Sequence, residues 1–334
     1  MNNAELSFFA SANSGRGFIN YYGDIFKGLK KHYIIKGGPG TGKSSLMKAI
    51  ATKAETKGMK VERYYCSSDP ESLDGIIICD ISVGITDGTA PHTADPKCPG
   101  VTDEIIDLGS FWDKSILADS KDIIIESVNK KAKLYRDVYS YLNAALTLDS
   151  IKQRRTADTV DITNLQSLAR SYTDVIPYRR GKQSVRLIDG ITMKGHHCFA
   201  PYRTEAEMIY NVKDSYGTGY IFLNYLKKSL SGNEMTVSYD ALDTEKVNMI
   251  YIPTDKILFC INSDQGEEIN IDEFVIGHTE DGIETRKAEL LSDAYQCLSD
   301  IEKLHFSLEE IYISAMDFPR KEKYQKKLIK EIFT

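Results

Sequence analysis

The residue types best suited to chemistry lie between positions 37 and 45. This stretch fits the pattern G-x-x-x-x-G-K-[ST], in which glycines let the backbone turn successive N–H groups toward phosphate oxygens. Lys43 would reach the β- and γ-phosphates, and Ser44 would ligate Mg²⁺. A glycine-rich turn that matches by chance is the alternative. The predicted nucleotide-binding residues are Gly37, Gly38, Pro39, Gly40, Thr41, Gly42, Lys43, Ser44 and Ser45.

The segments on either side of this loop have the order that the motif requires. Residues 33–35 form an apolar run typical of a strand, and residues 45–51 can begin a helix. The N-terminal end of such a helix adds positive potential beside the loop. The sequence therefore predicts that Mg-ATP binds here, with its phosphates on the loop.

An acid that holds the hydrated Mg²⁺ is expected at the end of a buried strand. Asp80 and Asp87 each follow an apolar run, so both fit by pattern. Asp87 is the preferred catalytic and metal-binding residue, together with Ser44 as metal ligand, because the Gly88 and Thr89 that follow suit a tight turn facing a ligand. Asp80 stays open as the alternative.

A second polar segment, residues 67–75, follows the predicted strand at residues 60–66. Open α/β folds bind ligands beyond the carboxyl ends of their strands, so a carboxylate here could orient the attacking nucleophile. Asp69 is the predicted catalytic residue, and Asp74 is its alternative. The segment can equally be a helix-capping loop. Arg16, between two glycines, is either a solvated turn residue or a guanidinium aimed at phosphate or at a neighbouring domain.

The rest of the chain reads as alternating strands and helices. Helices are predicted at residues 18–29, 121–148 and 158–172, the second of them from apolar residues spaced three, four or seven apart. Proline, glycine and consecutive charges at residues 177–182 indicate a domain boundary. The predicted domains are residues 1–176 and 177–334.

The second domain repeats the first in a decayed form. Residues 33–46 align with residues 210–223, and residues 16–17 align with 194–195. The same comparison pairs Asp69 with Asp240, Asp87 with Asn262 and Leu134 with Leu304.

The repeat replaces Lys43 by Tyr220 and Ser44 by Ile221. Neither residue can bind a triphosphate or a metal in the same way. We therefore expect one nucleotide site per chain and an inactive second domain that acts as a scaffold. The predicted fold class is α/β, with two tandem P-loop-like domains, each a mainly parallel sheet flanked by helices.

Composition restricts the partners. The chain has 42 basic and 48 acidic residues and a net charge of −6, which argues against a nucleic-acid partner. No apolar run approaches the length of a membrane span, and the N-terminus lacks the features of a signal peptide. The six cysteines and the histidines lack the spacing of a zinc site. These features indicate a cytoplasmic protein with reduced thiols.

Several motifs together resemble a family of duplicated P-loop ATPases from Gram-positive, often spore-forming bacteria, which carry general labels such as ATPase or nucleotide kinase. The resemblance covers nearly the whole chain and implies ATP binding without a defined substrate. The degenerate second loop departs from relatives in which that loop is better preserved. The motifs occupy residues 8–13, 36–44, 66–70, 73–75, 87–92 and 95–96.

Two functions are compatible with these residues. The first is Mg-dependent ATP hydrolysis or transfer of the γ-phosphoryl group to an acceptor; the second is ATP binding as a conformational signal without turnover. A GTPase is disfavoured because the chain has no N-K-x-D guanine motif. The acceptor, or a protein partner, is not identified by the sequence.

Overall fold

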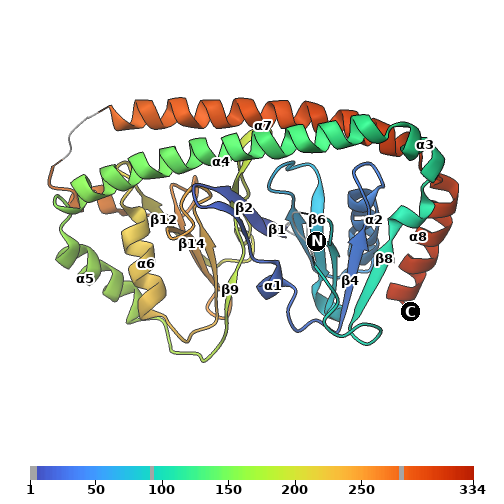
Figure 1. Ribbon diagram of the computed structural model, residues 1–334. Helices are drawn as coiled ribbons and strands as arrows, with labels where there is room; N and C mark the ends of the chain where they lie inside the picture. Colours follow the sequence, from blue (N-terminus) through green and yellow to red (C-terminus); the bar gives the residue numbers. More distant parts are fainter. Residues whose placement is uncertain (1–5, 91–93, 278–281) are drawn as a thin grey trace.

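The fold is built around two separate six-stranded sheets. A computed structural model describes residues 6–90, 94–277 and 282–334 (Figure 1). The first sheet has the order β1-β5-β6-β7-β4-β8. Its strands are β1 (Leu6–Phe9), β4 (Lys31–Lys36), β5 (Val61–Tyr65), β6 (Leu73–Ile78), β7 (Val83–Asp87) and β8 (Asp103–Asp107).

The second sheet has the same topology. Its order is β16-β12-β15-β14-β13-β9, the equivalent of the first sheet read from the other edge. This agreement supports the internal repeat that the sequence predicts. The strands are β9 (Gln183–Val185), β12 (Met208–Lys213), β13 (Met235–Tyr239), β14 (Val247–Ile252), β15 (Ile257–Ile261) and β16 (Glu267–Asn270).

The sheets are mixed, which corrects the prediction of a mainly parallel arrangement in detail. β6 pairs antiparallel with both β5 and β7, and β14 pairs antiparallel with both β13 and β15. The other pairings are parallel. The connections on either side of β6 and β14 are too short for a parallel crossover, which needs a dozen or more residues.

The predicted helix at residues 18–29 is wrong for most of its length. Residues 11–20 form an antiparallel hairpin of β2 (Ser11–Ser14) and β3 (Gly17–Asn20), followed by the single turn α1 (Tyr22–Ile25). Gly17 has φ of 92°, a conformation that glycine adopts without strain at the tight turn. The second half has the matching hairpin of β10 (Asp189–Thr192) and β11 (Gly195–Cys198).

Two long helices connect the halves. α4 (Lys121–Ala157) and α7 (Ile283–Ser314) lie side by side across both sheets (Figure 1). Lys131 of α4 contacts His305 of α7, whereas Asp149 of α4 contacts Lys287, so the two helices run antiparallel. Other short elements are α3 (Lys114–Asp119) and the 3₁₀ turns η1 (Cys79–Ile81), η2 (Leu108–Phe111) and η3 (Ile271–Phe274).

The helices that follow these long helices are exchanged between the halves. α5 (Ile162–Thr173) packs with α6 (Gly219–Ser229), and its Leu165 and Ala169 belong to the apolar core of the second sheet. α8 (Phe318–Ile332) packs on α2 (Lys43–Thr56), and its Leu328 belongs to the core of the first sheet. Hydrophobic packing therefore crosses the predicted division at residues 176 and 177.

We call the first sheet with α2 and α8 the first lobe, and the second sheet with α5 and α6 the second lobe. A shared core joins them, in which Phe8 and Tyr64 of the first sheet lie in one apolar cluster with Tyr202 and Tyr251 from the second half. The Tyr202 and Tyr251 rings stack with centroids 4.1 Å apart. None of the helices in the described part of the chain is long and apolar enough to cross a membrane.

Candidate nucleotide site

The glycine-rich loop, residues 37–44, joins β4 to the start of α2. Gly40 and Gly42 have φ of 67° and 79°, values that side chains disfavour and glycine accepts. The Thr41 hydroxyl donates to the Gly38 carbonyl oxygen at 2.9 Å and closes the loop. The strand, loop and helix thus occur in the predicted order, because the apolar residues 33–35 are buried in the sheet and the glycines allow the turn.

The Lys43 side chain folds back over the first residues of this loop. Its ammonium donates to the carbonyl oxygens of Gly37 and Gly38 at 2.9 and 2.8 Å, and lies 3.5 Å from the Asp87 carboxylate. Two residues predicted to act together, 44 positions apart in the chain, are therefore neighbours in space.

Asp87 ends β7, directly beside the loop. Residue 87 pairs with Ile35 across the sheet, and its carboxylate accepts a hydrogen bond from the Thr89 N–H at 2.8 Å. Burial raises the pKa of Asp87 above its ordinary value, while the Lys43 ammonium acts in the opposite direction. Asp80 precedes β7 and therefore lies at the other end of that strand, where it accepts from the Lys60 N–H. Asp87 is thus the acid beside Lys43.

The side chains of Ser44 and Asp87 are suited to a metal that also contacts phosphate. The Ser44 hydroxyl oxygen accepts a hydrogen bond from the Leu73 N–H at 3.0 Å. Two protein oxygens are too few for the octahedral shell of Mg²⁺, so phosphate and water would supply the rest, as is usual for this ion. Within the described ranges, no group of three His, Cys, Asp or Glu side chains gathers to hold a metal by itself.

The two carboxylates of the segment at residues 67–75 have different surroundings. Asp69 caps its own turn by accepting from the Glu71 N–H at 3.0 Å. Asp74 is buried, accepts from the Tyr22 hydroxyl at 3.1 Å, and is close enough to Asp87 to raise the pKa of that residue. Asp74, the alternative to Asp69, is therefore the carboxylate whose charge acts on Asp87.

Helix α7 from the second half contacts the glycine-rich loop, a contact between residues 269 positions apart that no local pattern indicates. The Glu309 carboxylate accepts from the Gly40 N–H at 3.3 Å. His305 lies one turn earlier, 3.5 Å from the same Glu309 oxygen, and its other ring nitrogen is 3.2 Å from the Lys131 ammonium of α4. Polar contacts therefore lead from the loop through α7 to α4.

Two aromatic side chains also border the loop. The rings of Trp112 and Tyr312 have centroids 5.3 Å apart. A Cβ at Gly38 would come within 3.2 Å of the Tyr312 ring and 3.3 Å of the Trp112 ring, so a larger residue would require the rings to shift by a few tenths of an ångström. The Trp112 indole nitrogen is buried and has no hydrogen-bond partner among the described residues. These rings are candidates to stack on a nucleotide base.

The equivalent loop of the second lobe is filled by the chain's own carboxylates. Asp214 stands where the first loop has Gly37, and its two oxygens accept from the N–H groups of Thr218 and Gly219, both at 2.8 Å. Asp272 accepts from the Ser215 N–H at 2.8 Å. The donors that would meet phosphate in an intact loop are thus already paired.

The register of β15 corrects one residue of the sequence comparison. Asp87 pairs with Ile35 in the first sheet, and Ile261 pairs with Val212, the counterpart of Ile35. The counterpart of Asp87 is therefore Ile261, an apolar residue, and not Asn262. Asn262 instead ties the loop, because its side chain accepts from the Asp214 N–H and donates to the Asp214 carbonyl oxygen, each at 2.9 Å.

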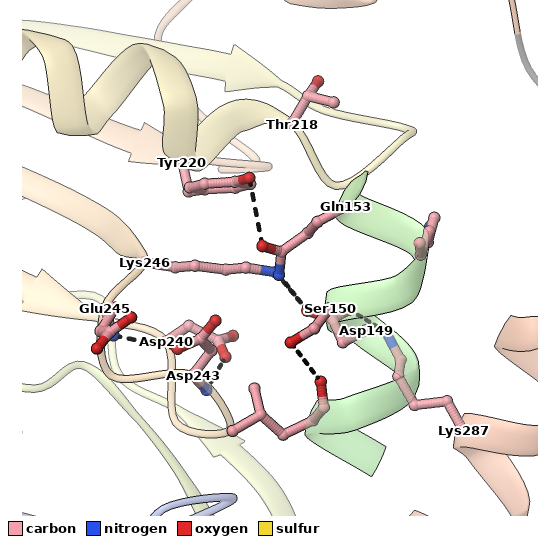
Figure 2. Close-up of polar contacts among 12 residues, drawn as sticks. Asp149, Ser150, Gln153, Thr218, Tyr220, Asp240, Asp243, Glu245, Lys246 and Lys287 are labelled. Carbon is pink, nitrogen blue, oxygen red and sulfur yellow. Dashed lines mark hydrogen bonds and ion pairs between the residues drawn. The ribbon is translucent and has the colours of Figure 1, made fainter. Parts of the chain in front are cut away.

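A cavity of about 620 Å³ lies beside this second loop. Figure 2 shows polar contacts of residues on its wall, among them Tyr220, Lys246 and Asp149. On its wall, the Lys246 ammonium lies 4.8 Å from the centre of the Tyr220 ring and pairs with Asp149 of α4. Lys287 of α7 also pairs with Asp149, at 3.1 Å. Burial acts to raise the pKa of Asp149, but the two ammonium groups outweigh it and lower that pKa to about 2.

Arg16 contacts the second lobe. Its guanidinium pairs with Asp243 at 3.4 Å and with Glu245 at 2.8 Å, both in the second lobe. Of the alternatives predicted for Arg16, contact with a neighbouring domain is the one that agrees with these ion pairs. Pro91 and His92, which belong to one of the motifs of the family resemblance, lie outside the described residues.

Comparison with known proteins does not assign the chain to a family. No protein-family model, curated protein or solved structure matches the chain, so its resemblance to the duplicated ATPases remains a hypothesis that rests on the motifs.

Proposed function

We propose that the first lobe binds Mg-ATP on the glycine-rich loop and hydrolyses it or transfers its γ-phosphoryl group to an acceptor. The observation that supports this most is the position of Lys43, which lies on the loop's mouth and beside Asp87. A lysine held by neutral carbonyl oxygens can exchange them for phosphate oxygens with little loss of hydrogen bonding.

Each residue has a distinct task in this proposal. The N–H groups of the loop and the N-terminal end of α2 bind phosphate, and Lys43 neutralises charge on the terminal phosphates. Ser44 and Asp87 hold Mg²⁺, which would screen the phosphate charge and orient the phosphate chain. Asp74 or Asp69 orients the nucleophile, with Asp74 favoured by its proximity to Asp87.

The proposal assigns the second lobe no triphosphate site. Tyr220 and Ile221 replace the lysine and the serine, and Asp214 occupies the loop's donors. The second half contributes instead through α7 and α8, which cover the first loop.

A nucleotide-dependent switch without turnover is the second candidate, and Glu309 favours it. Its carboxylate takes a backbone donor of the loop that phosphate would need, so binding must displace this contact from α7. Because α7 lies along α4 over both lobes, ATP in the first lobe could change how the halves pack.

Phosphate release separates the two candidates. It is measured with ATP and with GTP, with and without a panel of small metabolites, in the wild type, in Lys43→Ala and in Lys53→Ala. Lys53 is exposed on α2 and serves as the control. Turnover that is lost only in Lys43→Ala supports the enzyme. Lys43-dependent binding without turnover supports the switch, and absence of nucleotide binding by the wild type contradicts both.

A further inference from the structure

Lys321 of α8 lies against the glycine-rich loop, although it comes from the other half of the chain. Its side chain is buried, with 5% of the residue exposed. A Cβ at Gly42 would be 2.9 Å from the Lys321 ammonium nitrogen and 3.4 Å from its neighbouring carbon. The Lys321 ammonium thus rests on the residue that directly precedes Lys43 and caps the N-terminus of α2.

This ammonium is buried without an ion-pair partner among the described residues. It donates to the neutral amide oxygen of Gln325 at 3.0 Å, and no carboxylate of the described residues lies within ion-pairing distance. Burial lowers its pKa below the ordinary value for lysine, although the exposed Glu322 carboxylate acts in the opposite direction. The N-terminal end of α2, at Gly42, lies beside it, and its positive potential disfavours a cation there.

A buried ammonium without a counter-ion costs free energy unless an anion completes the site. The loop beside it has the backbone donors and the lysine that phosphate binding uses. One ligand would therefore satisfy the loop, Lys43 and Lys321 together, namely a polyanion such as the phosphate chain of a nucleotide.

We infer that Lys321 is a phosphate-binding residue that α8 contributes to the nucleotide held by the first lobe. This inference rests on the proposed function and adds a specific cation from the second half. It makes the nucleotide a ligand of both halves, because α8 directly follows α7, whose Glu309 contacts the same loop. Binding then gives the buried Lys321 ammonium an anionic partner.

The test uses the full chain with Lys321→Met, Lys321→Arg and the control Lys326→Met. Methionine keeps the apolar stem of lysine and removes the charge, and Lys326 is an exposed lysine on the same helix. Calorimetry with ATP and Mg²⁺ gives the affinity, and thermal unfolding without nucleotide gives the stability.

If Lys321 binds phosphate, Lys321→Met should lower the affinity for ATP without lowering the stability of the free protein. Lys321→Met should weaken ATP binding about tenfold or more, the loss expected for one charge-assisted hydrogen bond, while its melting temperature without nucleotide stays equal or rises. Lys321→Arg should retain more affinity than Lys321→Met, and Lys326→Met should behave as the wild type. A merely structural role would instead lower stability and affinity together.

Failure of the inference is distinguishable from failure of the proposed function. If Lys43→Ala abolishes ATP binding but Lys321→Met binds ATP as the wild type does, the inference is wrong and the ATP site stands. If Lys321→Met lowers stability and affinity in parallel, Lys321 has a packing role and the inference is also wrong. A wild type that does not bind ATP overturns both.

Discussion

The Lys131 ammonium of α4 lies 3.2 Å from Nδ1 of His305 on α7. A lysine makes the equivalent contact with the two helices interchanged, with aspartate in place of histidine. Lys287 of α7 follows Lys131 by 156 residues, and its partner Asp149 of α4 precedes His305 by the same number. The long helices are thus related by an approximate twofold axis. Each one carries side chains to the loop of the opposite lobe, Glu309 to Gly40 and Gln153 to Tyr220.

Replacing Glu309 with glutamine should strengthen ATP binding. The carboxylate of Glu309 holds a loop donor and repels phosphate, and the amide keeps the shape without the charge. We expect a gain of about three- to tenfold in affinity, on the order of 1 kcal/mol. Calorimetry measures it, with the exposed neighbour Glu310→Gln as control. Weaker binding in Glu309→Gln would show that the carboxylate assists the nucleotide.

Asp87→Asn should abolish the Mg²⁺ dependence of ATP binding, because the amide carries no charge to hold the hydrated ion. Asp80→Asn should leave the Mg²⁺ dependence intact, because Asp80 lies at the far end of β7, where it accepts a hydrogen bond from the Lys60 N–H. Titrations of ATP with and without Mg²⁺ on both variants provide the measurement. The reverse pattern would restore Asp80 as the metal-binding acid.

ATP should bind with a stoichiometry of one per chain, and Lys43→Ala should remove nearly all of the heat. The double variant Tyr220→Lys with Ile221→Ser should still bind only one ATP. The reason is that the Asp214 carboxylate holds the Thr218 and Gly219 donors whatever residue follows them. Calorimetric stoichiometry checks both statements, and a second tight site in either protein contradicts them.

The Asp149 carboxylate should make the free energy of unfolding decrease at acidic pH. Its pKa in the folded protein is about 2, below the ordinary 3.8, so its contribution is present above pH 4 and is lost as pH falls toward 2. The contribution is about 2 kcal/mol for a shift of this size. Urea unfolding at pH 5 and pH 2.5 should show a smaller loss of stability in Asp149→Asn than in the wild type. Equal losses would mean that the ion pairs with Lys246 and Lys287 contribute nothing.

The sequence predicted the parts of the site that are local. The glycines, Lys43 and the flanking strand and helix lie within 20 residues, so composition and periodicity suffice to place them. Asp87, preferred over Asp80 for the glycine that follows it, is the acid that lies beside Lys43, while its role in metal binding stays a prediction. The direction of β6 was missed, although its short connections exclude a parallel crossover.

Errors of alignment had a physical origin. Leu134 was paired with Leu304, an offset of 170, whereas the helix contacts give 156. The difference is 14 residues, close to four helical turns, after which an amphipathic stripe looks the same. The sequence comparison pairs Asp87 with Asn262 instead of Ile261, because a strand that is apolar on both faces has no alternating pattern to fix its register.

The contacts of Glu309 and Lys321 with the loop could not be read from the sequence at all. They depend on which lobe each helix packs against, and nothing in the apolar pattern of α7 or α8 specifies the sheet of the other half. Long-range placement of this kind is decided by the packed tertiary structure alone.

The exchange of α5 and α8 makes the chain a covalently linked counterpart of a swapped dimer. Each half on its own would lack the helix that closes its apolar core, Leu328 being one such missing side chain and Leu165 the other. Cutting the chain between the halves would leave two fragments that hold each other folded, whereas either fragment alone would expose core surface. Each half therefore depends on a helix from the other half to complete its apolar core.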